Sequence, residues 1–108
     1  MWICSKLGFY SIVKKQDGFH VRARLRRDLE NLCLEVGFAN ALIEEWPDAD
    51  YRWRIRLAPE AIGVLFVAFA ESIDYSNFKT EIAGCPDQAQ KLPIYGRIWQ
   101  QMGALQSE

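Results

Sequence analysis

This 108-residue sequence has few of the residues from which catalytic and metal sites are usually built. It contains one histidine, His20, and three cysteines, Cys4, Cys33 and Cys85, which lie far apart. It contains no phosphate-binding glycine loop and no HExxH or GxSxG motif. The odd number and wide spacing of the cysteines argue against a zinc site and against a disulfide framework. We therefore predict no cofactor, no metal site and no catalytic residue, and reduced thiols in a cytoplasmic protein.

Long hydrophobic runs are missing as well. The longest apolar run, residues 61–70, has ten residues, which is about half the length that a transmembrane helix needs. The first residues do not combine a basic region with an apolar stretch, so we expect no signal peptide. No repeat or linker divides the sequence. We expect one globular domain over residues 1–108 and no membrane partner.

Arginine is concentrated in two short segments, although the net charge of the chain is only -1. Residues 21–26 and 51–57 alternate apolar residues with arginine, and a period of two predicts a strand with one buried and one exposed face. The predicted exposed faces carry Arg22, Arg24, Arg26, Arg52, Arg54 and Arg56. These residues make up six of the 13 lysines and arginines. If the two strands share a sheet, the sequence predicts a basic surface suited to phosphates or carboxylates.

A hairpin is expected before the first arginine segment. Residues 9–15 and 19–25 have the composition of strands, and Asp17-Gly18 between them favours a two-residue turn that pairs Lys15 with His20. In that hairpin Phe9 and Lys15 fall on the same face as the arginines. We therefore include both in the predicted binding surface.

The rest of the sequence has mainly helical periodicity. We expect a third strand at residues 51–57, a short extra strand at Trp2–Cys4, a helical turn within 39–46, and helices at 26–36, 60–73, 78–83 and from 93 onward. Gly37 is expected to end the first helix. Residues 74–79 are expected to form a turn in which Ser76 caps a helix, and the alternative is a ligand-binding corner. The inner stripe of the 60–73 helix is predicted to be Ile62, Leu65, Phe66, Phe69 and Ile73. The fold class is α+β, with a small, mainly antiparallel sheet of three or four strands and helices packed on one face.

Two other groups of polar residues have a functional and a structural interpretation. His20 is either an exposed bystander or a general base. Asp48 and Asp50, which follow Glu44 and Glu45, are either solvated loop charges, partners of the adjacent arginine strand, or ligands for Mg²⁺ or Ca²⁺. Their spacing does not match an EF-hand loop.

The arginine surface also allows several interpretations. It can be a solvated sheet face, it can be neutralised by the protein's own carboxylates, or it can border a homodimer interface. It can also contact nucleic acid, with aromatic residues stacking on bases, or hold an acidic protein partner. A pI near 5.8 is low for a nucleic-acid-binding protein.

A resemblance to known proteins rests on residues spread over nearly the whole chain. They are Met1-Trp2-Ile3, residues 8–13, residues 21–24 with Asp28-Leu29, Asp50-Tyr51, residues 74–79, Tyr95 and Trp99. In these residues the chain resembles a group of small bacterial and phage proteins of unknown function. The resemblance implies a cytoplasmic protein of a bacterium or mobile element, and it implies no active site. Small proteins in that setting often act by binding, and some inhibit host CRISPR–Cas complexes.

Together these observations predict a non-enzymatic binding protein that contacts a protein or nucleic acid through its basic sheet face. Two alternatives remain open. One is a small metal-dependent enzyme or ligand-binding protein that uses the Asp48/Asp50 loop. The other is an obligate homodimer with a structural role.

Overall fold

A computed structural model of the chain describes residues 1–106, and its elements confirm the α+β class. The chain divides into two compact units, Met1–Asp74 and Tyr75–Glu108, which are described separately. The strands are β1 (Trp2–Ser5), β2 (Gly8–Lys15), β3 (Gly18–Ala23), β4 (Glu44–Glu45) and β5 (Trp53–Leu57). The α-helices are α1 (Arg26–Val36), α2 (Ile62–Ser72), α3 (Phe78–Ala83) and α4 (Leu92–Gly103). Four short 3₁₀ turns cover Asn40–Leu42, Pro59–Ala61, Ala89–Lys91 and Ala104–Gln106.

The first unit is built on a five-stranded antiparallel sheet with the strand order β1-β2-β3-β5-β4. The two arginine segments are therefore neighbours, because β3 pairs directly with β5. The sheet has five strands, whereas the sequence predicted three or four. Strand β1 extends the sheet at one edge, and the very short β4 extends it at the other. Only residues 40–42 of the expected helical turn at 39–46 are helical, and Glu44–Glu45 pair with β5 instead.

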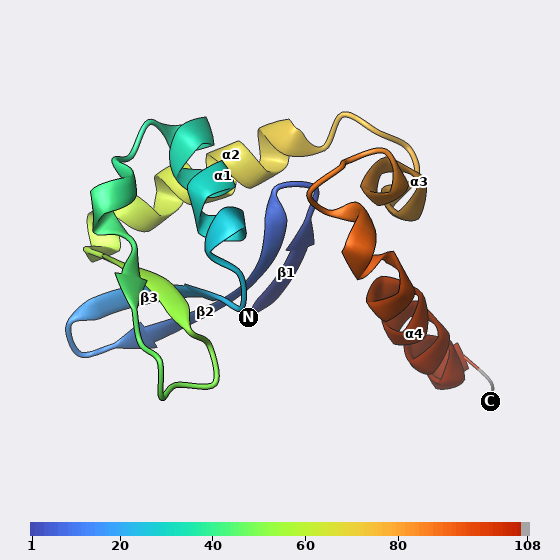
Figure 1. The fold of residues 1–108 in the computed structure, drawn as a ribbon, viewed down its shortest axis with the longest axis horizontal. Helices are drawn as coiled ribbons and strands as arrows, with labels where there is room; N and C mark the ends of the chain where they lie inside the picture. Colours follow the sequence, from blue (N-terminus) through green and yellow to red (C-terminus); the bar gives the residue numbers. More distant parts are fainter. Residues whose placement is uncertain (107–108) are drawn as a thin grey trace. The chain divides into compact units, whose positions relative to one another are not determined.

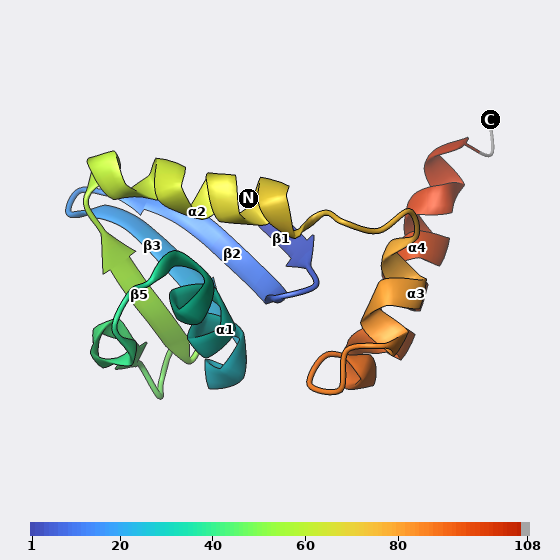
Figure 2. The same ribbon diagram turned by 90° about the horizontal axis from the view of Figure 1, so that it is seen from above.

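Helices α1 and α2 lie together on one side of this sheet (Figures 1 and 2). The side chains between the two layers form one hydrophobic core, which consists of Tyr10, Ile12, Val21, Ala23, Leu29, Leu32, Cys33, Ile55, Leu57, Leu65 and Phe69. The strand residues of this core alternate with the arginines, as a period of two requires. The predicted packing of helices on one sheet face is thus confirmed for these two helices.

Two contacts fix α1 against the sheet. The hydroxyl of Tyr10 donates a hydrogen bond of 2.6 Å to the backbone oxygen of Asp28, and both residues are buried. The Asp28 carboxylate accepts the backbone N–H of Phe9 at 3.2 Å. At the other end of the helix Gly37 has a φ of 77°, a left-handed conformation that glycine adopts without strain, so the predicted C-terminal stop is confirmed.

The β2–β3 hairpin differs from the predicted pairing by two residues. Lys15 pairs with Gly18 rather than with His20, so that Gln16 and Asp17 form the turn. Gly18 has a φ of 120° and belongs to the strand. The prediction was wrong because it counted Gly18 as a turn residue. A shift of two residues keeps every side chain on its predicted face, and the face assignment therefore survives.

The inner stripe predicted for α2 is only partly correct. Leu65 and Phe69 are buried in the core as expected, and Ala68 joins them. Phe66 and Ile73 are exposed instead. Helix α2 is apolar around much of its circumference, so the sequence pattern does not distinguish the side that faces the sheet from the other sides.

The second unit contains α3 and α4. The side chain of Asn77, not Ser76 as predicted, caps α3 by accepting the backbone N–H of Thr80 at 2.9 Å. The rings of Phe78 and Tyr95 pack together with 5.1 Å between their centroids. Further along α4 the apolar side chains are exposed, and they are Ile94, Ile98, Trp99 and Met102, with Leu105 in the following turn.

Candidate functional site

The sheet face turned away from α1 and α2, here called the outer face, carries most of the predicted site. Strand pairing aligns Trp2 with Ser11, Ser11 with Arg22, and Arg22 with Arg54 in one row across four strands. Its strand residues include Trp2, Phe9, Ser11, Val13, Lys15, His20, Arg22, Arg54 and Arg56. The alternation of side chains along each strand places this row opposite the core.

Arg54 is buried at the centre of the outer face, with 3% of its surface exposed. The indole ring of Trp46 covers it, with 3.8 Å between the guanidinium carbon and the ring centroid. Among the described residues no carboxylate lies within ion-pair distance of Arg54, and its Nε is a buried donor without a partner. Burial, reinforced by the neighbouring Arg22 guanidinium, lowers the pKa of Arg54 from its ordinary value.

His20 links Arg54 to the hairpin turn. Its Nδ1 lies 3.1 Å from Nη1 of Arg54, and its Nε2 lies 2.8 Å from Oδ1 of Asp17. A guanidinium can only donate, so Nδ1 accepts the Arg54 bond and Nε2 carries the proton that it donates to Asp17. The prediction of an exposed His20 is wrong, because the residue is buried and Trp46, distant in the sequence, packs edge-on against its ring.

Two of the arginines on β5 and just before it are neutralised by carboxylates of the same chain. Glu44 accepts the Nε–H of Arg56 at 2.7 Å, and Glu45 accepts that of Arg52 at 2.7 Å. Asp17 also lies within 3.4 Å of Arg56. The pairing of the acidic segment with the arginine strand, which the sequence left as one of several alternatives, is therefore confirmed for Glu44 and Glu45. Among the described residues Asp48 and Asp50 form no ion pair with an arginine.

These contacts shift the acidity of the carboxylates involved. The hydrogen bond to Arg56 holds the pKa of Glu44 below its ordinary value, and the hydrogen bond to His20 does the same for the pKa of Asp17. In return, Glu44 raises the pKa of Arg56. All three groups are therefore charged at neutral pH, and this side of the outer face carries nearly balanced charge.

Arg22 and Arg24 differ from these pairs because no carboxylate of the described chain lies within ion-pair distance of either. Both guanidiniums lie against the ring of the buried Tyr51, at 4.7 Å and 4.4 Å from its centroid. Arg22 donates to the hydroxyl of Ser11 at 2.6 Å, and Arg24 donates to the backbone oxygen of Asp50, also at 2.6 Å. The two cations are thus positioned by neutral acceptors and an aromatic ring.

The remaining residues of the predicted site are placed as follows. Phe9 lies on the outer face and packs edge-on against Trp2, with 6.2 Å between the ring centroids. Lys15 lies on the same face at the exposed end of β2. Arg26 does not join them, because β3 ends at Ala23 and Arg26 begins α1 in the helical layer. The helix predicted at 26–36 is confirmed, and Arg26 belongs to it and not to the alternating strand pattern of residues 21–26.

The alternative metal site at Asp48 and Asp50 finds no support in the arrangement of side chains. In the part of the chain that the structure describes, no three His, Cys, Asp or Glu side chains come together as metal ligands would. The Asp50 carboxylate instead accepts the backbone N–H of Tyr51 at 2.9 Å, which helps to position the ring beneath Arg22 and Arg24.

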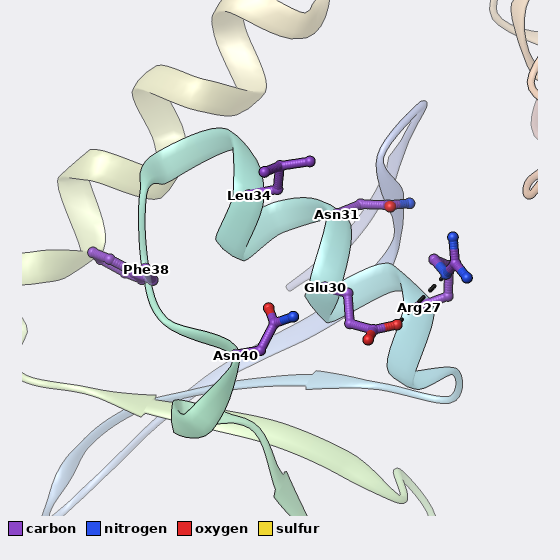
Figure 3. Close-up of a pocket in the computed structure, with 6 residues that line it drawn as sticks. All are labelled: Arg27, Glu30, Asn31, Leu34, Phe38 and Asn40. Atoms are coloured by element: carbon purple, nitrogen blue, oxygen red, sulfur yellow. Dashed lines mark ion pairs between the residues drawn. The ribbon is translucent and has the colours of Figure 1, made fainter.

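A depression of 540 Å³ beside α1 is a second place where a ligand could be sought (Figure 3). It is lined by Arg27, Glu30, Asn31, Leu34, Phe38 and Asn40. Three of its four polar side chains are engaged with the protein itself: Glu30 pairs with Arg27 at 3.5 Å, and Asn31 donates to the backbone oxygen of Leu7. Polar groups that converge on an open point mark a ligand pocket, and this depression does not provide them.

Several residues that shape the outer face were not predicted from the sequence. Trp46 and Tyr51 reach it from the loop between β4 and β5, and no local pattern indicates which arginine each ring will contact. Trp2 was placed only on a short extra strand, yet 71% of its surface is exposed beside Phe9. The sequence alone does not give the face of Trp2, because that face depends on the β1–β2 pairing, which aligns Trp2 with Ser11.

Comparisons with known proteins leave the chain without an assigned family. No family model matches it, and neither a curated protein nor a solved structure is similar enough to count as a match. The resemblance to small bacterial and phage proteins therefore stays a prediction. Among the described residues no helix is both long and apolar enough to cross a bilayer.

Proposed function

We propose that this chain is a non-catalytic binding protein that holds another protein on the outer face of its sheet. The observation that carries the proposal is the pair Arg22 and Arg24, two positioned guanidiniums without a carboxylate partner in the described chain, on the same face as the exposed ring of Trp2. Tryptophan, tyrosine and arginine are the residues that most often dominate the energy of protein interfaces.

The distribution of charge favours a protein partner over nucleic acid. A nucleic acid strand needs a track of cations along which several phosphates can lie. Here Arg52 and Arg56 are already paired with Glu45 and Glu44, so that only a small group of cations is left. On the other side of Arg22 the outer face continues with the uncharged residues Trp2, Phe9, Ser11 and Val13 of β1 and β2, and its one further cation on these strands, Lys15, lies at the hairpin end of β2. A compact site that combines charge with apolar surface suits a folded partner or a peptide.

Photo-crosslinking from the outer face tests this proposal. Benzoylphenylalanine would replace Trp2 in one variant and Leu34 in another, because Leu34 is 84% exposed on α1 and thus serves as the matched control on the helical side. Both variants would be irradiated in an extract of the source cells, with and without nuclease. We expect a discrete protein adduct from position 2 that nuclease leaves intact, and a much weaker one from position 34.

The proposal fails if position 2 gives no adduct beyond that from position 34. An adduct that disappears after nuclease treatment would show that nucleic acid is the partner instead. Mass spectrometry of the adduct identifies the partner, and an adduct with twice the mass of the chain would identify it as a second copy.

A further inference from the structure

The chain contains its own example of a segment bound to the outer face. Glu44 and Glu45 form the edge strand β4, which pairs with β5 through the backbone, and Trp46 follows them directly in the chain. Glu44 and Glu45 each bind an arginine side chain at 2.7 Å, while Trp46 covers the Arg54 guanidinium between them. The recognition chemistry on this half of the sheet is therefore carboxylate to guanidinium, combined with stacking on an aromatic ring.

At Arg22 and Arg24 only the aromatic part of this recognition chemistry is present. A guanidinium has five N–H groups, and the described contacts use two of them on Arg22 and one on Arg24. The ring of Tyr51 contacts the guanidiniums of Arg22 and Arg24, as the ring of Trp46 contacts that of Arg54. The carboxylates are the part that residues 1–106 do not supply to these two arginines within ion-pair distance.

We infer that the partner supplies them, as an acidic peptide segment whose aspartate or glutamate side chains pair with Arg22 and Arg24 beside Tyr51. The inference rests on the proposed function and names the chemistry of the partner. The pairs repeat those of Glu44 with Arg56 and of Glu45 with Arg52 one strand away. The planar, two-donor edge of arginine matches a carboxylate, and such pairs gain strength when a partner excludes water from them.

Neighbouring groups distinguish a carboxylate segment from a phosphate chain. Arg54, which lies beside Arg22, is buried beneath Trp46 and offers no exposed donor to a further phosphate. Arg52 and Arg56 are already held by Glu45, Glu44 and Asp17, so neither is left to pair with the phosphates of a strand that extends along β5. A peptide can place one or two carboxylates on Arg22 and Arg24 and continue with apolar side chains toward Phe9 and Trp2.

The test follows the Nε–H signals of the arginines in the nitrogen-15-labelled protein during titration with synthetic peptides. The acidic probe has the sequence of residues 44–50 of this chain, Glu-Glu-Trp-Pro-Asp-Ala-Asp. The matched probe replaces each Glu by Gln and each Asp by Asn, so that shape and aromatic content are kept. Inorganic phosphate and a short oligouridylate form two further arms. We expect the acidic peptide to shift the Arg22 and Arg24 signals in a saturable, salt-sensitive manner, and the amide peptide to leave them in place.

Equal shifts from the acidic and amide peptides, or no shift from either, would overturn the inference. A stronger response to the oligonucleotide than to the acidic peptide would also overturn it. The Arg22→Gln/Arg24→Gln variant is expected to lose saturable binding of the acidic peptide, whereas Arg26→Gln/Arg27→Gln, with the same loss of charge on α1, is expected to keep it. If the peptide titration fails but position 2 gives a protein adduct, the proposed function stands and only the inference of an acidic partner segment is refuted.

Discussion

Gly18 is the residue on which the geometry of the hairpin depends, and replacing it with alanine should destabilise the protein strongly. Its φ of 120° lies in a region that residues with a Cβ rarely adopt, which costs of the order of 1–3 kcal/mol. A Cβ at this position would also lie 3.3 Å from the carbonyl carbon of Leu57 and still closer to its oxygen. The β3–β5 pairing would have to shift, and each hydrogen bond that it loses costs about 1 kcal/mol.

The expected loss for Gly18→Ala is therefore about 3 kcal/mol. Gly37→Ala is the matched control, because Gly37 also has a positive φ, of 77°, but a Cβ there meets nothing within 4 Å. Its expected cost is about 1 kcal/mol. Urea denaturation followed by circular dichroism would give both free energies of unfolding. A loss for Gly18→Ala no larger than that for Gly37→Ala would refute the steric reasoning.

Three further predictions concern acidity, hydrogen bonding and thiol reactivity. Because the pKa values of Asp17 and Glu44 are lowered in the folded protein, their contribution to stability is complete above the ordinary carboxyl pKa of about 4 and is lost as the pH falls through the folded pKa values. The variant Asp17→Asn/Glu44→Gln should therefore flatten the acid side of a curve of unfolding free energy against pH, measured by urea denaturation. An unchanged slope would contradict this prediction. Tyr10→Phe removes a buried hydrogen bond to a carbonyl of α1 and should cost about 1–2 kcal/mol in the same assay, whereas no loss would show that the bond is dispensable. Burial raises the pKa of the Cys33 thiol, so a brief reaction with a thiol reagent should modify the exposed Cys4 and spare Cys33, as peptide mass spectrometry would show; equal labelling would place Cys33 nearer to solvent.

The elements that the sequence predicted best are those with a strong local signal. The alternation of arginine with apolar residues correctly indicated β3 and β5, and Gly37 correctly marked the end of α1. Periodicity also assigned the residues of β2, β3 and β5 to their faces, because the core-facing residues alternate with the polar ones. These features depend on residues close together in the chain.

The features that the sequence did not predict depend on contacts between distant residues. The burial of His20 and Arg54 requires Trp46, which arrives from a different loop. The same loop brings Glu44 to Arg56, so the charge that remains on the outer face cannot be counted from the alternating pattern alone. Of the six arginines that the pattern singled out, only Arg22 and Arg24 belong to the partner site that we propose.

The most direct test of this account compares two double variants in their affinity for the protein that crosslinks from position 2. Arg22→Gln/Arg24→Gln and Arg26→Gln/Arg27→Gln each remove two positive charges, but the second pair lies on α1, where Glu30 binds both arginines. Calorimetric titration should show affinity falling by about 30-fold or more for the outer-face variant and by less than about twofold for the helix variant, because truncating a paired interfacial charge costs about 2–5 kcal/mol. Equal effects of the two variants would mean that only net charge matters, and would contradict the assignment of Arg22 and Arg24 as the binding site.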